Sequence, residues 1–347
     1  MLDRILAPVL PALISAAEQG RLPDVALRAG VRRMVAGRAA RCEAEDPEAT
    51  DAFVASLSAA PLALVPDTAN EQHYELPPAF FEHVLGPHLK YSGCWYGNDV
   101  VDLAQAERAM LDRTLERAGV EDGMRVLDLG CGWGSFALFC AEQRPGCRVT
   151  AVSNSKPQRE FILARAAARG IDLDVVTADM NGFEAPGRFD RVVSVEMFEH
   201  MRNWPLLLER IAGWLTPEGR AFVHHFCHES SAYPYEIRDE GDWMARHFFT
   251  GGMMPSEGLI ARFPAHLSVE ERWRVDGTHY QKTADAWLAR MDASRDALQP
   301  VFRETYGADA ERWWGRWRLF FMGCAELFGH SHGQTWFVTH QRLAPTA

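Results

Sequence analysis

The segment from Val126 to Ser135 constrains the fold of this chain more than any other. Its apolar residues lead to Asp128, and glycines follow at alternate positions, Gly130, Gly132 and Gly134. Glycine is needed where the backbone adopts a positive φ or closes on a ligand. The segment therefore predicts a buried parallel strand that turns sharply into a helix. Asp128 would then lie at the carboxyl edge of an open α/β sheet, where ligands bind.

The spacing of these glycines indicates the kind of ligand. It is Gly-x-Gly-x-Gly, which differs from the Gly-x-Gly-x-x-Gly of dinucleotide folds, and no Lys-Ser/Thr follows as in a phosphate loop. An acid directly before the glycines suits a ligand with a positive charge. S-adenosylmethionine carries a sulfonium and an ammonium, so it fits this turn. The alternative is a glycine-rich turn that arose by chance.

Strands and helices alternate after this turn. Helix-length segments separate the strands, which predicts βαβ units and a parallel sheet. We expect a Rossmann-like doubly wound α/β sheet of the class I methyltransferase kind, with N-terminal helices and an inserted, mainly helical cap. The expected strands cover residues 125–129, 148–153, 173–177, 191–195 and 220–225, with a final strand over about 335–343.

Four segments follow from this pattern. We expect an N-terminal helical segment, a Rossmann-like S-adenosylmethionine-binding core, a helical and aromatic substrate cap, and a last strand of the core sheet. The first part of the cap, up to residue 290, is expected to be irregular. The segments span residues 1–100, 101–225, 226–330 and 331–347.

Charge and cysteine content exclude several classes of protein. The 347 residues carry a net charge of −11, whereas nucleic acids and anionic membranes bind basic faces, so we expect neither as a partner. Seven cysteines of irregular spacing indicate no disulfide framework and favour a reducing cytoplasm. No signal peptide and no membrane-spanning run are recognisable. The oligomeric state stays open, with a homodimer as one alternative.

Two further strand ends carry candidate cofactor residues. Ser153, Asn154 and Gln158 follow the second strand and could bind ribose hydroxyls through neutral groups, in place of an acid. A plain helix cap at Ser155 is the alternative, and both roles fit the same turn. After the third strand, Asp179 and Met180 suit an adenine, with the carboxylate on its amine; an exposed loop acid is the alternative.

The fourth strand ends in the sharpest candidate site, Val195 followed by Glu196, Glu199 and His200. In a helical turn the last three side chains share one face. An alkylammonium with a pKa of about 10.4 must lose its proton before its nitrogen can accept a methyl group. Carboxylates and an imidazole can hold the cation and then take the proton. The alternative is a salt-bridged start of a helix.

Histidines and aromatic residues add weaker signals. His224, His225, Cys227 and His228 resemble a metal cluster, but they do not share one face of a strand, so we expect no metal. His225 could line the pocket at the end of the fifth strand. Aromatic residues around the expected pocket suit a flat or cationic ligand, although ordinary core packing explains many of them. They include Tyr74, Tyr91, Tyr280, Phe328 and Trp336.

Together these segments resemble the cyclopropane-fatty-acid-synthase-like group of S-adenosylmethionine methyltransferases, and within it the coclaurine N-methyltransferase family. The resemblance runs from about His73 to the C-terminus. It is carried by His73-Tyr-Glu, Tyr91-Ser-Gly-Cys-Trp-Tyr, Val126–Ser135, Ala151-Val-Ser-Asn-Ser, Val195–Met201, Cys227-His228, Phe249-Thr-Gly-Gly-Met-Met-Pro-Ser, His279-Tyr280 and Glu326-Leu-Phe-Gly.

The resemblance implies that the N-terminal helical segment covers the cofactor, and it implies roles for individual residues. Glu199 and His200 match a catalytic pair, Glu196 lies beside them, and Tyr74 and Glu75 match positions of the substrate pocket. S-adenosylmethionine would contact Tyr91, Ser92, Gly130, Asn154, Gln158, Asp179, Met180 and Val195.

Two positions separate the subfamilies. Cyclopropane synthases typically have glycine where this chain has Glu196, and a bicarbonate-binding cysteine where it has Gly93. Glu199, His225 and Tyr280, however, match other bicarbonate-site positions of those enzymes. The balance favours methylation of nitrogen. Gly93 also departs from the plant coclaurine enzymes, which leaves the shape of the pocket open.

We therefore predict an S-adenosylmethionine-dependent N-methyltransferase that acts on a small aromatic amine such as a tetrahydroisoquinoline. A lipid-modifying cyclopropane synthase is the second hypothesis, and it requires an acyl tunnel and a membrane-docking face. A cofactor-binding protein without catalysis is the third, and the intact carboxylate–imidazole cluster disfavours it.

Overall fold

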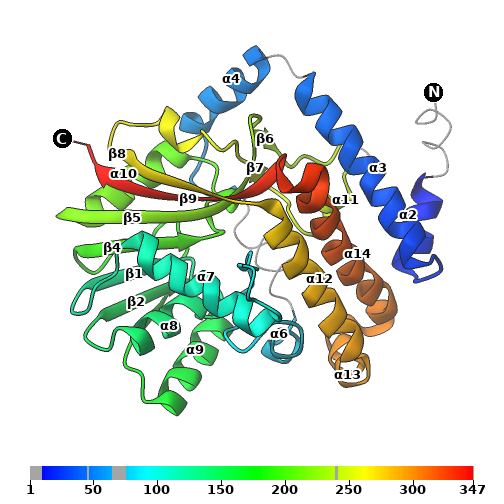
Figure 1. Cartoon of the computed structure of the whole chain (residues 1–347), viewed down its shortest axis with the longest axis horizontal. Coiled ribbons are helices and arrows are strands. Elements are labelled where there is room, and N and C mark those ends of the chain that lie inside the picture. The colour runs from blue at the N-terminus through cyan, green and yellow to red at the C-terminus, as the bar shows by residue number, and fades with distance from the viewer. Residues whose placement is uncertain (1–9, 45–46, 65–75, 239–240, 347) are drawn as a thin grey trace.

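A seven-stranded sheet forms the centre of the computed structural model, which describes residues 10–44, 47–64, 76–238 and 241–346 (Figure 1). Its strand order is β3-β2-β1-β4-β5-β9-β8, and β9 runs antiparallel to both of its neighbours. The first five strands are parallel. The strands are β1 (Arg125–Leu129), β2 (Arg148–Ser153), β3 (Asp174–Thr177), β4 (Phe189–Val195), β5 (Leu215–His228), β8 (Leu267–Val275) and β9 (Trp336–Pro345).

Helices cover both faces of this sheet. Three of them pack on one face, α7 (Leu103–Ala118), α8 (Ser135–Gln143) and α9 (Lys156–Arg169), and α10 (Trp204–Trp214) packs on the other (Figure 1). Side chains alternate along the buried strands, because successive residues of a strand point to opposite faces. In β1, Val126 joins the core under α7, while Leu127 joins the core under α10.

A second group of helices lies beside the sheet, at the end where the parallel strands finish (Figure 1). Aromatic residues dominate its core, and Trp287 and Trp317 are almost completely buried there. The helices of this group are α2 (Leu10–Glu18), α3 (Asp24–Glu43), α6 (Pro78–Val84), α12 (Gly277–Ala293), α13 (Arg295–Tyr306) and α14 (Ala310–Gly329).

Short elements complete the described chain. A small two-stranded sheet pairs Tyr233 with Met254. The remaining elements are α4 (Pro47–Ser56), η1 (Leu57–Ala59), η2 (Phe198–His200), β6 (Tyr233–Pro234), α11 (Trp243–His247), β7 (Met253–Met254), η3 (Ile260–Arg262), η4 (Gly307–Asp309) and η5 (His330–Gly333). Among the described residues, no helix combines the length and the apolar composition needed to cross a membrane.

The sequence predicted the doubly wound core, and the structure confirms it with two corrections. The segment 226–290 is not irregular throughout, since β8 lies within it and extends the core sheet. Five of the nine residues of β8 are exposed, so it lacks the apolar alternation that marks a strand. The fifth strand is also longer than predicted, because pairing with β9 continues to His228.

Candidate active site

A cavity of about 1320 Å³, partly open to solvent, lies beyond the carboxyl ends of β1, β2, β3 and β4. This is the edge at which parallel sheets bind ligands. All eleven residues predicted to bind the cofactor line it, which brings together segments up to about 100 residues apart in the chain. They are Tyr91, Ser92, Asp128, Gly130, Gly132, Ser153, Asn154, Gln158, Asp179, Met180 and Val195.

The glycine turn at the end of β1 forms the floor of this cavity. Gly130 adopts a φ of +82°, and a Cβ atom there would lie 2.6 Å from Cγ of Met197. Gly132 also has a positive φ, of +52°, but a Cβ atom there would meet nothing within 4 Å. The first glycine is thus required by close packing. The second leaves open space on the cavity side, which a ligand can fill.

Asp128 carries the charge of this turn. It is 1% exposed, and its Oδ2 atom has no hydrogen-bond partner within the described part of the chain. Burial raises the pKa of Asp128 to about 7, although the backbone N–H of Ala137 acts in the opposite direction. A buried acceptor without a partner is costly, so this carboxylate suits a cationic ligand that restores the missing interaction.

The turn after β2 combines the two roles that the sequence left open. Ser155 caps α9 by accepting a hydrogen bond from the backbone N–H of Gln158. The Ser153 hydroxyl donates to Oε1 of Gln158 at 2.5 Å, which leaves Nε2 of that buried amide without a described partner. This free donor is of the neutral kind that a ribose hydroxyl accepts.

The third strand end supplies a carboxylate and a thioether. The Asp179 carboxylate accepts hydrogen bonds from the backbone and the amide side chain of Asn181, at 3.0 to 3.3 Å. Met180 is 8% exposed and joins the core under α10. Both residues border the cavity, so a flat ring could lie against Met180 with its edge at Asp179.

A buried carboxylate that the sequence analysis missed shapes the opposite wall. Glu107 of α7 accepts hydrogen bonds from the backbone N–H groups of Gly86, His88 and Lys90. It thereby fixes the loop that leads to Tyr91 and Ser92. A buried acid on a helix face otherwise formed by Ala106, Met110 and Leu111 was the available signal.

Lys90 is the second residue that the sequence analysis missed. Its ammonium is buried at the cavity wall and donates to Oγ of Ser92 at 2.5 Å and to the carbonyl oxygen of Gly93 at 2.8 Å. Burial lowers the pKa of Lys90, while the charges of Glu196 and Glu107 act to raise it. Lys90 thus connects the cofactor wall with the fourth strand end.

Glu196 occupies the cavity wall directly after β4, with a φ of +49° that side chains rarely adopt. Its Oε1 accepts hydrogen bonds from the Gly93 N–H at 2.8 Å and from Nε2 of His224 at 3.1 Å. Its Oε2 accepts the Tyr280 hydroxyl at 2.7 Å. Burial raises the pKa of Glu196, and the charge of Lys90 and the donors of Gly93 and Tyr280 oppose that effect. The strained backbone and three donors direct this carboxylate at the cavity.

Glu199 and His200 follow in the next turn, and their side chains point to different places. His200 lines the cavity and stacks on Phe249 at 5.2 Å, and burial lowers its pKa to about 4. Glu199 is fully buried behind it, and the backbone N–H of Phe226 donates to its Oε1 at 2.7 Å. Burial and the charge of Glu196 raise the pKa of Glu199. The two residues that face the cavity are therefore Glu196 and His200.

The predicted substrate residues fall on different parts of the molecule. Tyr280 contacts Glu196, and its ring stacks on Phe328 at 4.2 Å. Trp336 lies in the same aromatic core, where its indole donates to the Tyr233 hydroxyl. His225 lies on the other face of the sheet, against Trp204 and Gln341. Tyr74 and Glu75 lie outside the described residues.

Comparisons with known proteins place this chain among its relatives. The family model described as mycolic acid cyclopropane synthetase matches residues 66–337. (S)-Coclaurine N-methyltransferase of Thalictrum flavum subsp. glaucum is 38% identical over 82% of this chain and 81% of its own length. Cyclopropane-fatty-acyl-phospholipid synthase of Escherichia coli (strain K12) is 30% identical over 78% of this chain and 67% of its own length.

A solved structure extends the likeness to the whole fold. The crystal structure of coclaurine N-methyltransferase bound to N-methylheliamine and SAH superposes with a TM-score of 0.92 at 34% identity. The match covers 97% of this chain and 99% of that one.

Proposed function

Because the chain belongs to the mycolic acid cyclopropane synthetase family, among its coclaurine N-methyltransferase-like members, we propose that it methylates the nitrogen of a small aromatic amine. The chain is an S-adenosylmethionine-dependent N-methyltransferase. The amine class that we propose is a benzylisoquinoline or tetrahydroisoquinoline. These compounds combine a basic nitrogen with a flat ring.

The described residues fit S-adenosylmethionine. Asp128, with its unpartnered Oδ2, would hold the ammonium, and the free amide donor of Gln158 would reach the ribose. Asp179 and Met180 would bind the adenine. When bound, the cofactor supplies a methyl group on an electrophilic sulfonium, and the amine nitrogen displaces S-adenosylhomocysteine.

The observation that carries the proposal is the carboxylate of Glu196 at the cavity wall. Three donors fit its ionised form, and one side of Oε2 is left to accept from an ammonium. Because burial raises its pKa, Glu196 is a stronger base than an exposed glutamate. It can therefore hold the protonated amine and then remove the proton that blocks the nitrogen lone pair.

His200 would be the second group at the amine. Its pKa of about 4 keeps the imidazole neutral near neutral pH, so it can accept a hydrogen bond from the substrate. Glu199 would support this pair from behind, since its own carboxyl group is buried away from the cavity. The family resemblance gives Glu199 a direct part, so the two glutamates need separate tests.

The aromatic ring of the substrate would lie on the side of the cap. Tyr280 and Phe328 stack on each other next to Glu196, and Phe249 stacks on His200. Aromatic rings suit a flat cation, but these three pack beside the cavity and do not line it. We also propose that Tyr74 and Glu75 contribute to this side of the pocket, and that Trp336 and His225 contribute only as support.

A panel assay tests the function. Purified protein and S-adenosylmethionine are offered tetrahydroisoquinolines, simple arylalkylamines and phospholipid vesicles, and product masses are measured. We expect a gain of one methyl group on a tetrahydroisoquinoline. Product from the vesicles alone would replace this function with that of a lipid-modifying synthase.

A further inference from the structure

A chain of hydrogen bonds runs from Glu196 through strands β5 and β9 to Arg117 in the last turn of helix α7. Nε2 of His224 lies 3.1 Å from Oε1 of Glu196, and Nδ1 of His224 lies 3.0 Å from Nε2 of His340. Nδ1 of His340 lies 2.8 Å from a guanidinium nitrogen of Arg117. The two histidines sit on directly paired positions of β5 and β9.

Arg117, at the far end of this chain of hydrogen bonds, fixes the direction of every hydrogen bond in it. A guanidinium has only donors, so Arg117 must donate to Nδ1 of His340. The proton of His340 is then on Nε2, and it is donated to Nδ1 of His224. By the same reasoning His224 carries its proton on Nε2 and donates it to Glu196. Arg117 thus ensures that Glu196 receives a donor.

Burial keeps both histidines neutral, as this direction requires. Each is 0% exposed, and burial lowers the pKa of both well below the ordinary value, with Arg117 and Lys90 adding to the effect. An imidazolium has no acceptor nitrogen, so protonation of either ring would break the chain. The charged and titratable groups that interact with Glu196 are Lys90, Cys94, Glu199, His200, His224, His225, Tyr280 and Cys324.

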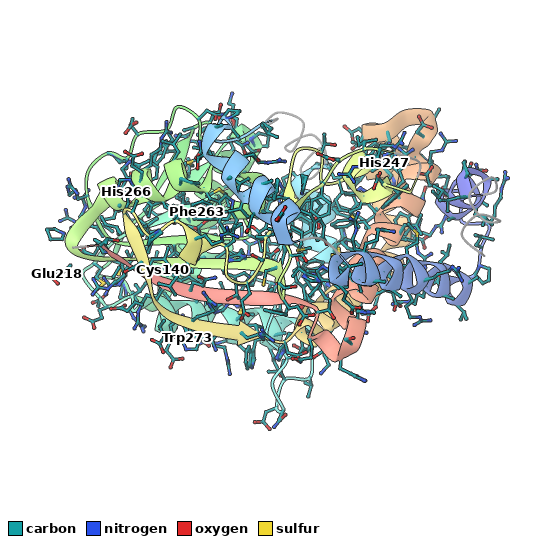
Figure 2. All side chains as sticks on the ribbon, turned by 90° about the horizontal axis from the view of Figure 1, so that it is seen from above. Cys140, Glu218, His247, Phe263, His266 and Trp273 are labelled. Carbon is teal, nitrogen blue, oxygen red and sulfur yellow. The ribbon has the colours of Figure 1, made fainter. Side chains whose placement is uncertain are left out.

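Core packing alone does not account for this arrangement. Buried polar groups are costly unless each finds a partner, and here the ring nitrogens of both histidines are satisfied in a single line. Arg117 is held at the outer end between the rings of Trp95 and Trp273, at 5.8 and 5.2 Å. Trp273 marks that end at the edge strand β8 (Figure 2).

We propose that Arg117, His340 and His224 are positioning residues of the methyl transfer, which orient Glu196 and keep it ionised. None of the three needs to touch the substrate. Loss of the donor from His224 would favour the protonated form of Glu196 and free its carboxylate to rotate away from the amine. The inference rests on the proposed function, because the amine gives the orientation of Glu196 its purpose.

The test compares two neighbouring arginines of α7. Arg117→Met removes the outer donor. Arg113→Met removes an arginine that also lies over Trp95, at 4.0 Å, but its hydrogen bond goes to the carbonyl oxygen of Ala109 and not to either histidine. We expect Arg117→Met to lower kcat about tenfold, as substitutions behind a first contact group do. The acid limb of its kcat/KM profile should move to higher pH, because the pKa of Glu196 rises. Its KM for S-adenosylmethionine and the rate of Arg113→Met should stay unchanged.

A second pair of variants separates hydrogen bonding from packing. The glutamine of His340→Gln can accept from Arg117 and donate to His224, so it should retain most of kcat. His340→Leu fills similar space without a donor and should lose at least as much activity as Arg117→Met. Equal losses in these two variants, or equal rates in Arg113→Met and Arg117→Met, would overturn the proposal.

A measurement without substrate distinguishes this inference from the proposed function. Nitrogen-15 NMR of the histidines should show neutral rings protonated at Nε2 for both His224 and His340. Protonation at Nδ1 would contradict the proposed directions of these hydrogen bonds, whichever substrate the enzyme methylates. The expected NMR result together with a failed amine assay would instead overturn the proposed function alone.

Discussion

Two acids at the ends of neighbouring strands, Asp128 of β1 and Glu196 after β4, are both buried but differ in their surroundings. Asp128 has an oxygen without a described partner, and its turn leaves open space. Glu196 receives hydrogen bonds from Gly93, His224 and Tyr280. The first site is incomplete until a cation binds. The second is organised beforehand by the protein. We infer that the first binds the cofactor and the second performs the transfer.

The largest effect should come from Glu196→Gln. Glutamine has nearly the same shape but cannot take the amine proton, so kcat should fall about 100-fold or more. Affinity for S-adenosylhomocysteine, measured by calorimetry, should stay within about threefold, because Glu196 belongs to the other site.

Glu199→Gln is the matched control for this substitution. Burial and the charge of Glu196 raise the pKa of Glu199, which favours its protonated form, and an amide has nearly the shape of that form. We expect a loss of kcat below about tenfold. A greater loss in Glu199→Gln than in Glu196→Gln would assign the transfer to the inner glutamate instead.

The next largest effect should be on cofactor binding in Asp128→Asn. Removal of the charge that faces the ammonium should weaken binding by about 10- to 100-fold, the range of a charged hydrogen bond. The expected change is in the calorimetric Kd and in KM for S-adenosylmethionine. Unchanged values would show that the turn is not organised around a cation.

The same variant should reveal a smaller effect on stability without ligand. The pKa of Asp128 is about 7 in the folded chain and near 3.8 in the unfolded one, so the folded state binds the proton more strongly. The stability contributed by this group is fully present below about pH 4 and is lost as pH rises towards 7. Asp128→Asn should therefore raise Tm relative to the parent protein at about pH 8, and less so at about pH 5. An advantage that is larger at low pH would contradict this.

The smallest effect should come from Gly93→Ala. A Cβ atom at this position would lie 3.2 Å from Cδ1 of Tyr280, so the ring must shift by a few tenths of an ångström. The N–H of residue 93 still donates to Glu196. We expect kcat to fall about two- to fivefold, within the usual size of mild packing changes, with cofactor affinity unaltered. A loss as large as that of Glu196→Gln would mean that the position of Tyr280 limits the transfer.

Local patterns in the sequence predicted one of the two sites better than the other. The turn at residues 126–135 was predicted as observed, because its glycines and acid are adjacent in the chain and their roles follow from backbone geometry. The bounds of β1 and β2 also agree with the prediction. Each of these features depends on residues within a few positions of one another.

The surroundings of Glu196 were beyond the reach of such patterns. They depend on the register that pairs His224 with His340, two residues 116 positions apart, and on a loop held by Glu107. A polar residue such as His340 in a buried strand indicates a hydrogen-bond partner, but the sequence does not identify that partner. Strand β8 escaped prediction because its charged side chains face solvent.

Cofactor binding at Asp128 and methyl transfer at Glu196 can be separated most directly in one experiment. It measures turnover of a tetrahydroisoquinoline by Asp128→Asn and Glu196→Gln at saturating S-adenosylmethionine. Our account predicts that the rate of Asp128→Asn returns close to that of the parent protein, because its defect is in binding. The rate of Glu196→Gln should remain low at every cofactor concentration. Recovery of Glu196→Gln, or failure of Asp128→Asn to recover once the cofactor is bound, would contradict the assignment of binding to one strand end and transfer to the other.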